Sequence, residues 1–320
     1  MIYRRLGRTE IDVSLLSVGS GGYNRFGQAK GVPESEMHRF VHHALDLGIN
    51  HFDTAVPPSY GDSELILGRA LADVARDRYT LSTKFAVIDS ESDQVLSSER
   101  IVKHVEESLL NMQIDELDIL LLGGAGMGGE FDRVMNEIRP TLEQLVRDGK
   151  VRHIGSSENS SDDGGHSWLE KAVEDELIEV VMVSYNMMNQ SAERTVFPGC
   201  RKNDVGAMGI YTVRNAFSIP SRLCEVVGEL KESGVLGDEV PDEDPLGWLL
   251  DDDGGEGESL ASAAYRFSAA NEAISTIVCG TIDIAHLEAN VMSIEKPPLS
   301  AEKMARLRQL FGHIATSIGN

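Results

Sequence analysis

Short apolar runs alternate with longer amphipathic segments along most of the chain. Runs of this length, bounded by turn residues, are typical of strands that are buried on both faces. Eight of them predict such strands, at residues 14–20, 51–55, 79–85, 117–123, 151–158, 180–186, 206–212 and 275–281.

The amphipathic segments between these runs predict helices. Residues 35–48, 98–112 and 131–149 carry apolar side chains near positions i, i+3, i+4 and i+7. Gly48 and Gly149 follow two of these segments, where a left-handed cap is expected. Strands that alternate with helices indicate right-handed crossovers and a parallel sheet, and eight such repeats favour closure into a (β/α)8 barrel. An open doubly wound sheet is the alternative.

Three further segments extend this α/β barrel, which we expect to form a single domain over residues 1–320. Residues 2–14 are expected to form a hairpin below the barrel, and residues 300–314 a C-terminal helix that starts at Ser300. Residues 213–260 form a long loop region, in which 237–258 carry ten acidic and no basic side chains. The acidic stretch is interpreted as a solvated loop with one short helix held by Trp248, or as a flap over the mouth that disfavours anionic substrates.

Composition narrows the class of protein. The 320 residues carry a formal net charge of −23, which disfavours nucleic acid or an anionic membrane as a partner. Three cysteines without a CxxC pair, no apolar stretch near the roughly 18 residues of a membrane helix, and no signal-peptide core predict a cytoplasmic location. An oligomer is compatible with these features.

Residues that follow the strands are the candidates for chemistry, because barrel active sites lie at the carboxyl ends of strands. Asp53, Tyr60 and Lys84 follow strands two and three. An ammonium beside a phenol favours the phenolate and lowers the tyrosine pKa from about 10, and a carboxylate holds the ammonium in place. Each residue also has a structural interpretation: a turn cap for Asp53, loop packing for Tyr60 and a surface ion pair for Lys84.

Metal and nucleophile chemistry have little support. His42 and His43 are adjacent on a predicted helix, so their side chains point in different directions and chelate a metal poorly. No serine or cysteine occupies a nucleophile elbow. We therefore expect no metal site.

Motifs in order along nearly the whole chain resemble those of the aldo-keto reductases. They are YRRLGRTEIDVS (3–14), GINHFDTA (48–55), YGDSELILGRAL (60–71), LSTK (81–84), VEESLLNMQIDELDILLL (105–122), GKVRHIG (149–155), SYN (184–186) and GTIDIAHLEAN (280–290). The resemblance implies a (β/α)8 barrel without a Rossmann domain, which binds NADPH across its mouth and exchanges a hydride with a carbonyl compound.

The resemblance also implies catalytic roles. The family's tetrad of Asp, Tyr, Lys and His falls on Asp53, Tyr60, Lys84 and Gly123, so the last member, a donor to the substrate carbonyl, is replaced by glycine. Compared with similar family members, two residues are inserted between Asp53 and Tyr60, and we expect a bulge at Pro57-Pro58 to absorb them.

The family's cofactor contacts map onto further positions. The residues that hold the nicotinamide carboxamide fall on Ser157, Glu158 and Met182, of which Met182 lacks a comparable hydrogen bond, and Tyr211 falls where an aromatic ring stacks on the nicotinamide. Contacts to the phosphates and the adenosine fall on Gly19, Ser20, Thr212, Val213, Arg214, Asn215, Gly280, Thr281, His286 and Asn290. The family's cofactor is NADPH, but the positions whose cationic side chains usually bind its 2'-phosphate are Gly280 and His286 here, so NADH is kept as the alternative.

The leading hypothesis is therefore an NAD(P)H-dependent oxidoreductase that acts on a small carbonyl compound, alcohol or sugar. The glycine at 123 leaves two alternatives open. One is a cofactor-binding barrel without turnover, such as a sensor, and the other is a redirected catalyst, such as an isomerase or lyase.

Overall fold

The computed structural model describes residues 1–22, 24–89, 91–123, 128–158, 163–250 and 258–316. Within them, eight parallel strands close into a barrel in the order β10-β3-β4-β5-β6-β7-β8-β9. The strands are β3 (Leu16–Gly19), β4 (His51–Asp53), β5 (Thr80–Ala86), β6 (Leu117–Gly123), β7 (Val151–Ser157), β8 (Ile178–Ser184), β9 (Gly206–Ile210) and β10 (Ile274–Cys279). The predicted (β/α)8 barrel is confirmed, and each predicted strand overlaps one of these, with ends that differ by a few residues.

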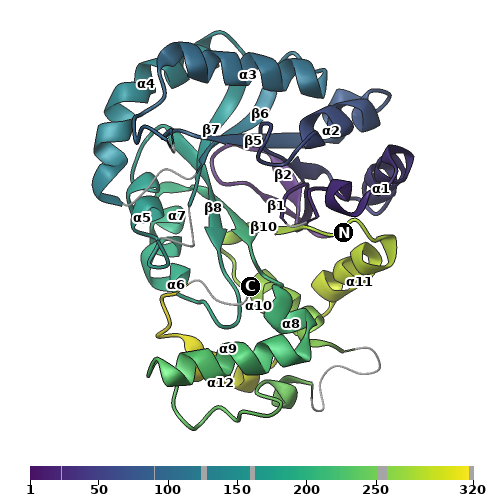
Figure 1. Ribbon diagram of the computed structural model, residues 1–320, viewed down its shortest axis with the longest axis vertical. Helices are drawn as coiled ribbons and strands as arrows, with labels where there is room; N and C mark the ends of the chain where they lie inside the picture. Colours follow the sequence, from purple (N-terminus) through teal and green to yellow (C-terminus); the bar gives the residue numbers. More distant parts are fainter. Residues whose placement is uncertain (23, 90, 124–127, 159–162, 251–257, 317–320) are drawn as a thin grey trace.

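Helices surround the barrel, with α3 and α4 across the top of the view in Figure 1. They are α1 (Glu34–Asp46), α2 (Ser63–Leu71), α3 (Ser98–Met112), α4 (Phe131–Arg147), α5 (Ser167–Ala172), α6 (Ala192–Thr195), α7 (Phe197–Asn203), α8 (Asn215–Ser218), α9 (Pro220–Glu232), α10 (Leu260–Ala269), α11 (Ile284–Glu295) and α12 (Ala301–Phe311). Short 3-10 turns are η1 (Gln28–Lys30), η2 (Arg76–Arg78), η3 (Gly128–Glu130) and η4 (Gly247–Leu249). Ser300 accepts a hydrogen bond from the backbone N–H of Lys303 and starts α12, as predicted.

The predicted N-terminal hairpin closes one end of the barrel. Strands β1 (Tyr3–Arg5) and β2 (Asp12–Ser14) pair antiparallel, and Leu6 and Val13 pack in one core cluster with side chains of β6, β8 and β9. Gly7 has a φ of 53°, and a Cβ there would lie 2.2 Å from the backbone N of Gly206. Only glycine fits a turn that is both left-handed and this close to a strand. The interior is therefore filled, and the opposite end of the strands is left for a site.

The long region after β9 differs from the prediction of a loop. It contains α8 and the 13-residue helix α9, which buries Leu223, Val226, Val227 and Leu230. Those side chains recur at helical spacing, and their burial stabilises the helix. Further along, η4 is the expected short helix: Leu249 is buried, and the Arg306 guanidinium of α12 lies 4.2 Å from the Trp248 ring centre. Residues 251–257 of the acidic stretch lie outside the described residues.

Candidate active site

The carboxyl ends of β4 and β5 bring two of the predicted residues together. Asp53 is the last residue of β4 and pairs in register with Ser82 of β5, two residues before Lys84. Alternate residues of a strand face the same side, so Ser82 and Lys84 share a face. Lys84 Nζ donates to Asp53 Oδ2 at 2.6 Å and to the Thr54 carbonyl at 3.0 Å.

This ion pair is largely shielded from solvent. The side chains of Lys84 and Asp53 are 12% and 4% exposed, and Ser82 Oγ donates to Asp53 Oδ1 at 2.8 Å. Burial by itself lowers the pKa of Lys84, but the charges of Asp53 and Tyr60 and its hydrogen bonds to them outweigh burial, and the pKa lies above its ordinary value. Lys84 is therefore a fixed positive charge at neutral pH.

Tyr60 reaches this pair from the loop after β4. Pro57, Pro58 and Ser59 are exposed, as expected for an outward bulge, and the chain then returns so that Lys84 Nζ lies 4.9 Å from the Tyr60 ring centre. Gln28 of η1 fixes the return: its amide donates to the Tyr60 carbonyl at 3.0 Å and accepts from the backbone N–H of Asp62 at 2.8 Å. The two loops thus hold the phenol beside the ammonium.

The protonation of Tyr60 differs from the sequence-based expectation. Burial raises its pKa, and the opposing effect of Lys84 is too small to bring it below the ordinary value. Lys84 does act to lower the pKa, as predicted, but the expectation that the pKa of Tyr60 lies below its ordinary value is wrong. The physical reason is desolvation of the phenolate, which the sequence does not reveal. At neutral pH the phenol keeps its proton and is available as a donor.

Gly21, just after β3, makes room for Tyr60. A Cβ on Gly21 would lie 2.2 Å from Tyr60 Cζ and 2.6 Å from its hydroxyl oxygen. We expect Gly21→Ala to displace the phenol and to lower kcat about 10- to 100-fold, because ångström-scale misplacement of a reacting group is costly. Steady-state kinetics with a thermal melt test this. Gly228→Ala is the control, since a Cβ there meets no described atom within 4 Å. Unchanged kcat in Gly21→Ala would contradict the steric argument.

Gly123 is the buried last residue of β6 and pairs in register with Ala86, two residues after Lys84 in β5. A Cβ at this position would lie 3.1 Å from the Phe85 carbonyl oxygen, which is closer than an ordinary van der Waals contact. Any larger side chain here therefore requires a small movement of β5 at Phe85. The position supplies no hydrogen-bond donor of its own beyond the backbone.

The two residues predicted to meet the carboxamide have different surroundings. Ser157 ends β7 and is buried. Glu158 was expected to accept from an amide, but both of its oxygens are already used within the protein: Oε2 lies 2.6 Å from His166 Nδ1, and Oε1 accepts from the Ser184 N–H at 2.6 Å. Glu158 therefore joins β7 to β8 and to the start of α5. Met182 is packed in the barrel interior.

Tyr211 lies at the rim beyond β9. Its φ of 62° is unusual for a side chain this large, and Asn186 Nδ2 holds its carbonyl at 3.1 Å. Tyr211 is 42% exposed, and the Arg214 guanidinium lies over its ring, 3.6 Å from the ring centre. A strained aromatic residue kept at a rim is typical of a ligand contact.

The remaining predicted contacts lie at the ends of β3, β9 and β10. Gly19 ends β3, and the buried Ser20 Oγ next to it has no hydrogen-bond partner in the described part of the chain. Ser184 Oγ, at the end of β8, is likewise buried and unpartnered there. Burial raises the pKa of the Cys279 thiol to about 12, and the Asn290 side chain acts in the opposite direction. The others follow β9 (Thr212, Val213, Arg214 and Asn215) or β10 (Gly280, Thr281 and His286).

Unpartnered buried hydroxyls are rare, because each costs free energy unless a ligand or water satisfies it. Ser20 and Ser184 stand at the carboxyl ends of their strands, where a ligand enters a barrel. The residues present therefore fit a polar ligand such as a nicotinamide cofactor.

Comparison with known proteins decides the family. Residues 17–219 match the model of the aldo/keto reductase family. The chain belongs to that family. It is 28% identical over 304 residues to L-galactose dehydrogenase from Arabidopsis thaliana, covering 91% of this chain and 87% of the relative.

Solved structures of aldo-keto reductases share the fold. The holo form of aldo-keto reductase AKR11C1 from Bacillus halodurans matches with a TM-score of 0.71 at 22% identity, covering 100% of this chain and 98% of the other. Its apo form gives a TM-score of 0.68 with the same identity and coverage. As a member of the aldo/keto reductase family, the protein described here is an NAD(P)-dependent oxidoreductase.

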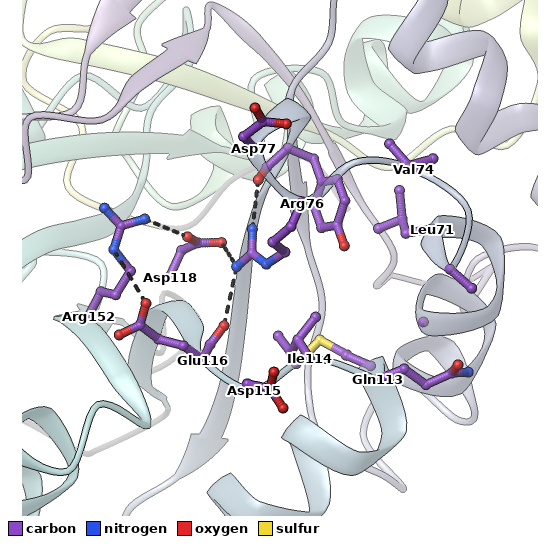
Figure 2. Close-up of a pocket in the computed structure, with 14 residues that line it drawn as sticks. Leu71, Val74, Arg76, Asp77, Gln113, Ile114, Asp115, Glu116, Asp118 and Arg152 are labelled. Atoms are coloured by element: carbon purple, nitrogen blue, oxygen red, sulfur yellow. Dashed lines mark hydrogen bonds and ion pairs between the residues drawn. The ribbon is translucent and has the colours of Figure 1, made fainter.

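The structure of our protein also has a cavity of about 550 Å³, which lies away from the candidate site. Figure 2 shows it with Arg76, Asp118 and Arg152 in a row, at the amino ends of β5, β6 and β7. Asp118 accepts from Arg76 at 2.5 Å, from Arg152 at 3.0 Å and from the Leu81 N–H at 2.8 Å. Active sites of such barrels lie at the other end of the strands, so this network is structural.

We expect Asp118→Asn to lower the free energy of unfolding by about 2–3 kcal/mol, because three donors lose a buried carboxylate. Chemical denaturation measures the loss, and kcat should stay unchanged. Asp115→Asn, at an exposed position on the same cavity, is the control. A selective loss of activity in Asp118→Asn would instead place this cavity in the function.

Several residues around Tyr60 and Asp53 were not predicted as part of the site. Ser82 carried a signal, since it lies two positions before Lys84 and thus on the same strand face. Gly21 and Gln28 carried none, because their contacts with the Tyr60 loop arise only when two loops far apart in sequence meet.

Proposed function

We propose that the protein transfers a hydride between NAD(P)H and a small carbonyl compound or the corresponding alcohol, with Tyr60 as proton donor or acceptor. The proposal rests above all on the contact of Asp53, Lys84 and Tyr60 at the carboxyl ends of the strands of an aldo/keto reductase barrel. In this scheme Lys84 stabilises the phenolate and Asp53 orients Lys84.

The chain's own residues handle the proton. Bound nicotinamide supplies the hydride chemistry. During reduction, the Tyr60 hydroxyl gives its proton to the substrate oxygen, and the phenolate that remains faces the Lys84 ammonium. Asp53 and the Thr54 carbonyl take two of the hydrogen bonds of Lys84, which leaves the ammonium directed toward the phenol. During alcohol oxidation the same groups take the proton back.

The residues that would hold the cofactor include several expected from the family, such as Ser20, Tyr211 and Arg214, together with Ser184, which was not predicted. Tyr211 and Arg214 form a stacked pair at the rim, and the hydroxyls of Ser20 and Ser184 are buried and without described partners. These features support an extended polar ligand over the barrel mouth. We expect NADPH, with NADH as the alternative.

Gly123 shapes the choice of substrate. With no side-chain donor at the end of β6, we infer that the substrate oxygen is held by Tyr60 together with a water or a hydroxyl of the substrate itself. Polyhydroxylated substrates such as aldoses supply that hydroxyl. The L-galactose dehydrogenase relative supports testing aldoses first.

The test combines binding with turnover. Titration of NADPH and NADH, followed by fluorescence, gives the dissociation constants, and a panel of aldehydes, ketones and aldoses is then assayed for change in the absorbance of reduced nicotinamide. We expect binding and turnover. Binding without any turnover would favour a cofactor sensor, and products formed with no net use of cofactor would favour an isomerase or lyase.

A further inference from the structure

His51 continues the hydrogen-bonded network below Asp53. It begins β4, two residues before Asp53, and therefore shares the strand face of that residue. Its Nε2 lies 3.1 Å from Ser82 Oγ, whose hydroxyl lies 2.8 Å from Asp53 Oδ1. His51 and Ser82 are 0% exposed and Asp53 is 3% exposed, so water does not compete for these contacts.

The direction of each hydrogen bond follows from the chemistry of the groups. Asp53, paired with the Lys84 ammonium, only accepts. The single hydroxyl proton of Ser82 is donated to Asp53 Oδ1, so Ser82 Oγ accepts from His51. His51 therefore carries its proton on Nε2. Nδ1 has no hydrogen-bond partner among the described residues, which fits a lone pair and not a buried N–H.

The charges around His51 agree with a neutral ring. Burial, with a smaller contribution from the charge of Lys84, lowers the pKa of His51 to about 4, although Asp53 and Asp118 act in the opposite direction. A neutral imidazole with its proton on Nε2 is a donor of fixed direction. It holds Ser82 so that the hydroxyl cannot turn away from Asp53.

We propose that His51 is a positioning residue of the reaction: through Ser82 it fixes the Asp53 carboxylate, which in turn directs Lys84 at the Tyr60 phenol. The proposal rests on the function proposed above. Without the His51 donor, the Ser82 hydroxyl is free to rotate and Asp53 Oδ1 loses its only side-chain donor among the described residues. The Asp53 carboxylate is then able to rotate, and the Lys84 ammonium that pairs with it is no longer held in one direction.

The first experiment needs no activity. Correlation NMR of protein labelled with ¹⁵N-histidine reads the tautomer of His51, with His51→Gln used for assignment. We expect a proton on Nε2 and none on Nδ1 at neutral pH. A proton on Nδ1, or a charged ring, would overturn the proposal even if the enzyme reduces every substrate offered.

The second experiment compares His51→Leu, His51→Gln and Ser82→Ala. The leucine variant keeps the size without a donor, whereas the glutamine amide nitrogen can reach the place of Nε2. We expect kcat to fall about tenfold in His51→Leu and Ser82→Ala with KM little changed, and to be largely restored in His51→Gln. The double variant His51→Leu/Ser82→Ala should be no worse than either single variant, because both remove the same interaction.

A third readout separates positioning from folding. Ultraviolet difference titration of the Tyr60 phenol, taken against Tyr60→Phe, should show an altered pKa in His51→Leu and a wild-type value in His51→Gln. His153→Leu serves as the control, because His153 lies on a strand but pairs with Glu179 instead. Equal losses in the leucine and glutamine variants, or an unchanged phenol pKa in His51→Leu, would reduce His51 to a packing role. If the wild type shows no turnover, the proposed function is rejected. The His51 tautomer and the pKa of the Tyr60 phenol still test the positioning role of His51, because neither measurement needs turnover.

Discussion

Replacing Tyr60 by phenylalanine should lower kcat about 100- to 10,000-fold while the dissociation constant for NADPH stays within about twofold. The phenol keeps its proton at neutral pH because burial raises its pKa, so the variant loses the proton donor itself. The ring that packs over Gly21 is kept, and the loop held by Gln28 should not move. Stopped-flow turnover and fluorescence titration of the cofactor measure the two quantities.

Tyr79→Phe is the matched control for this change. It removes the same hydroxyl at the other end of the strands, beside the Arg76 cavity. If Tyr60→Phe retained more than about a tenth of the wild-type kcat, a different group would have to move the proton.

Replacing Lys84 by methionine should lower kcat about 100- to 1000-fold and move the pH dependence of alcohol oxidation upward. Oxidation needs the phenolate, which is present above the pKa of Tyr60. Lys84 acts to lower that pKa, so its loss raises the pKa further and the rate rises only at higher pH. Reduction needs the protonated phenol, so its kcat declines above the pKa of Tyr60. Because that pKa is higher in the variant, the decline should move beyond the measured pH range.

Profiles of kcat against pH in both directions check this prediction. Circular dichroism of the variant should accompany them, because Asp53 then lies buried without its cation. Lys202→Met removes a lysine from the exposed pair with Glu174 and should leave both profiles unchanged. An oxidation profile that stays in place in Lys84→Met would show that the ammonium does not tune Tyr60.

Much of the fold could be predicted because buried positions are apolar and their pattern depends on the element. The nearly continuous apolar run LDILLLG at 117–123 forms β6 with the predicted bounds. In PSRLCEVVGELKE at 220–232 the apolar residues recur at helical spacing, but the acidic residues beyond this segment favoured a loop, and α9 was not predicted.

The candidate site was less predictable wherever two distant segments determine its chemistry. Asp53 and Lys84 meet because neighbouring parallel strands end at the same edge, which the order of strands already implies. The partner of Glu158 is His166, which the start of α5 brings back to the end of β7. The protonation of Tyr60 depends on how deeply two loops bury it, and burial is a property of the assembled structure.

The contacts of Gln28 with the chain after Tyr60 carry an evolutionary consequence. They anchor the loop that carries Tyr60 downstream of Pro57 and Pro58, while Asp53 anchors it upstream. The exposed residues between the two anchors contribute no side chain to the proposed site of Asp53, Lys84 and Tyr60. Natural selection is therefore able to lengthen or shorten this stretch, and so to remodel the rim that meets the substrate, without rebuilding the chemistry beneath it.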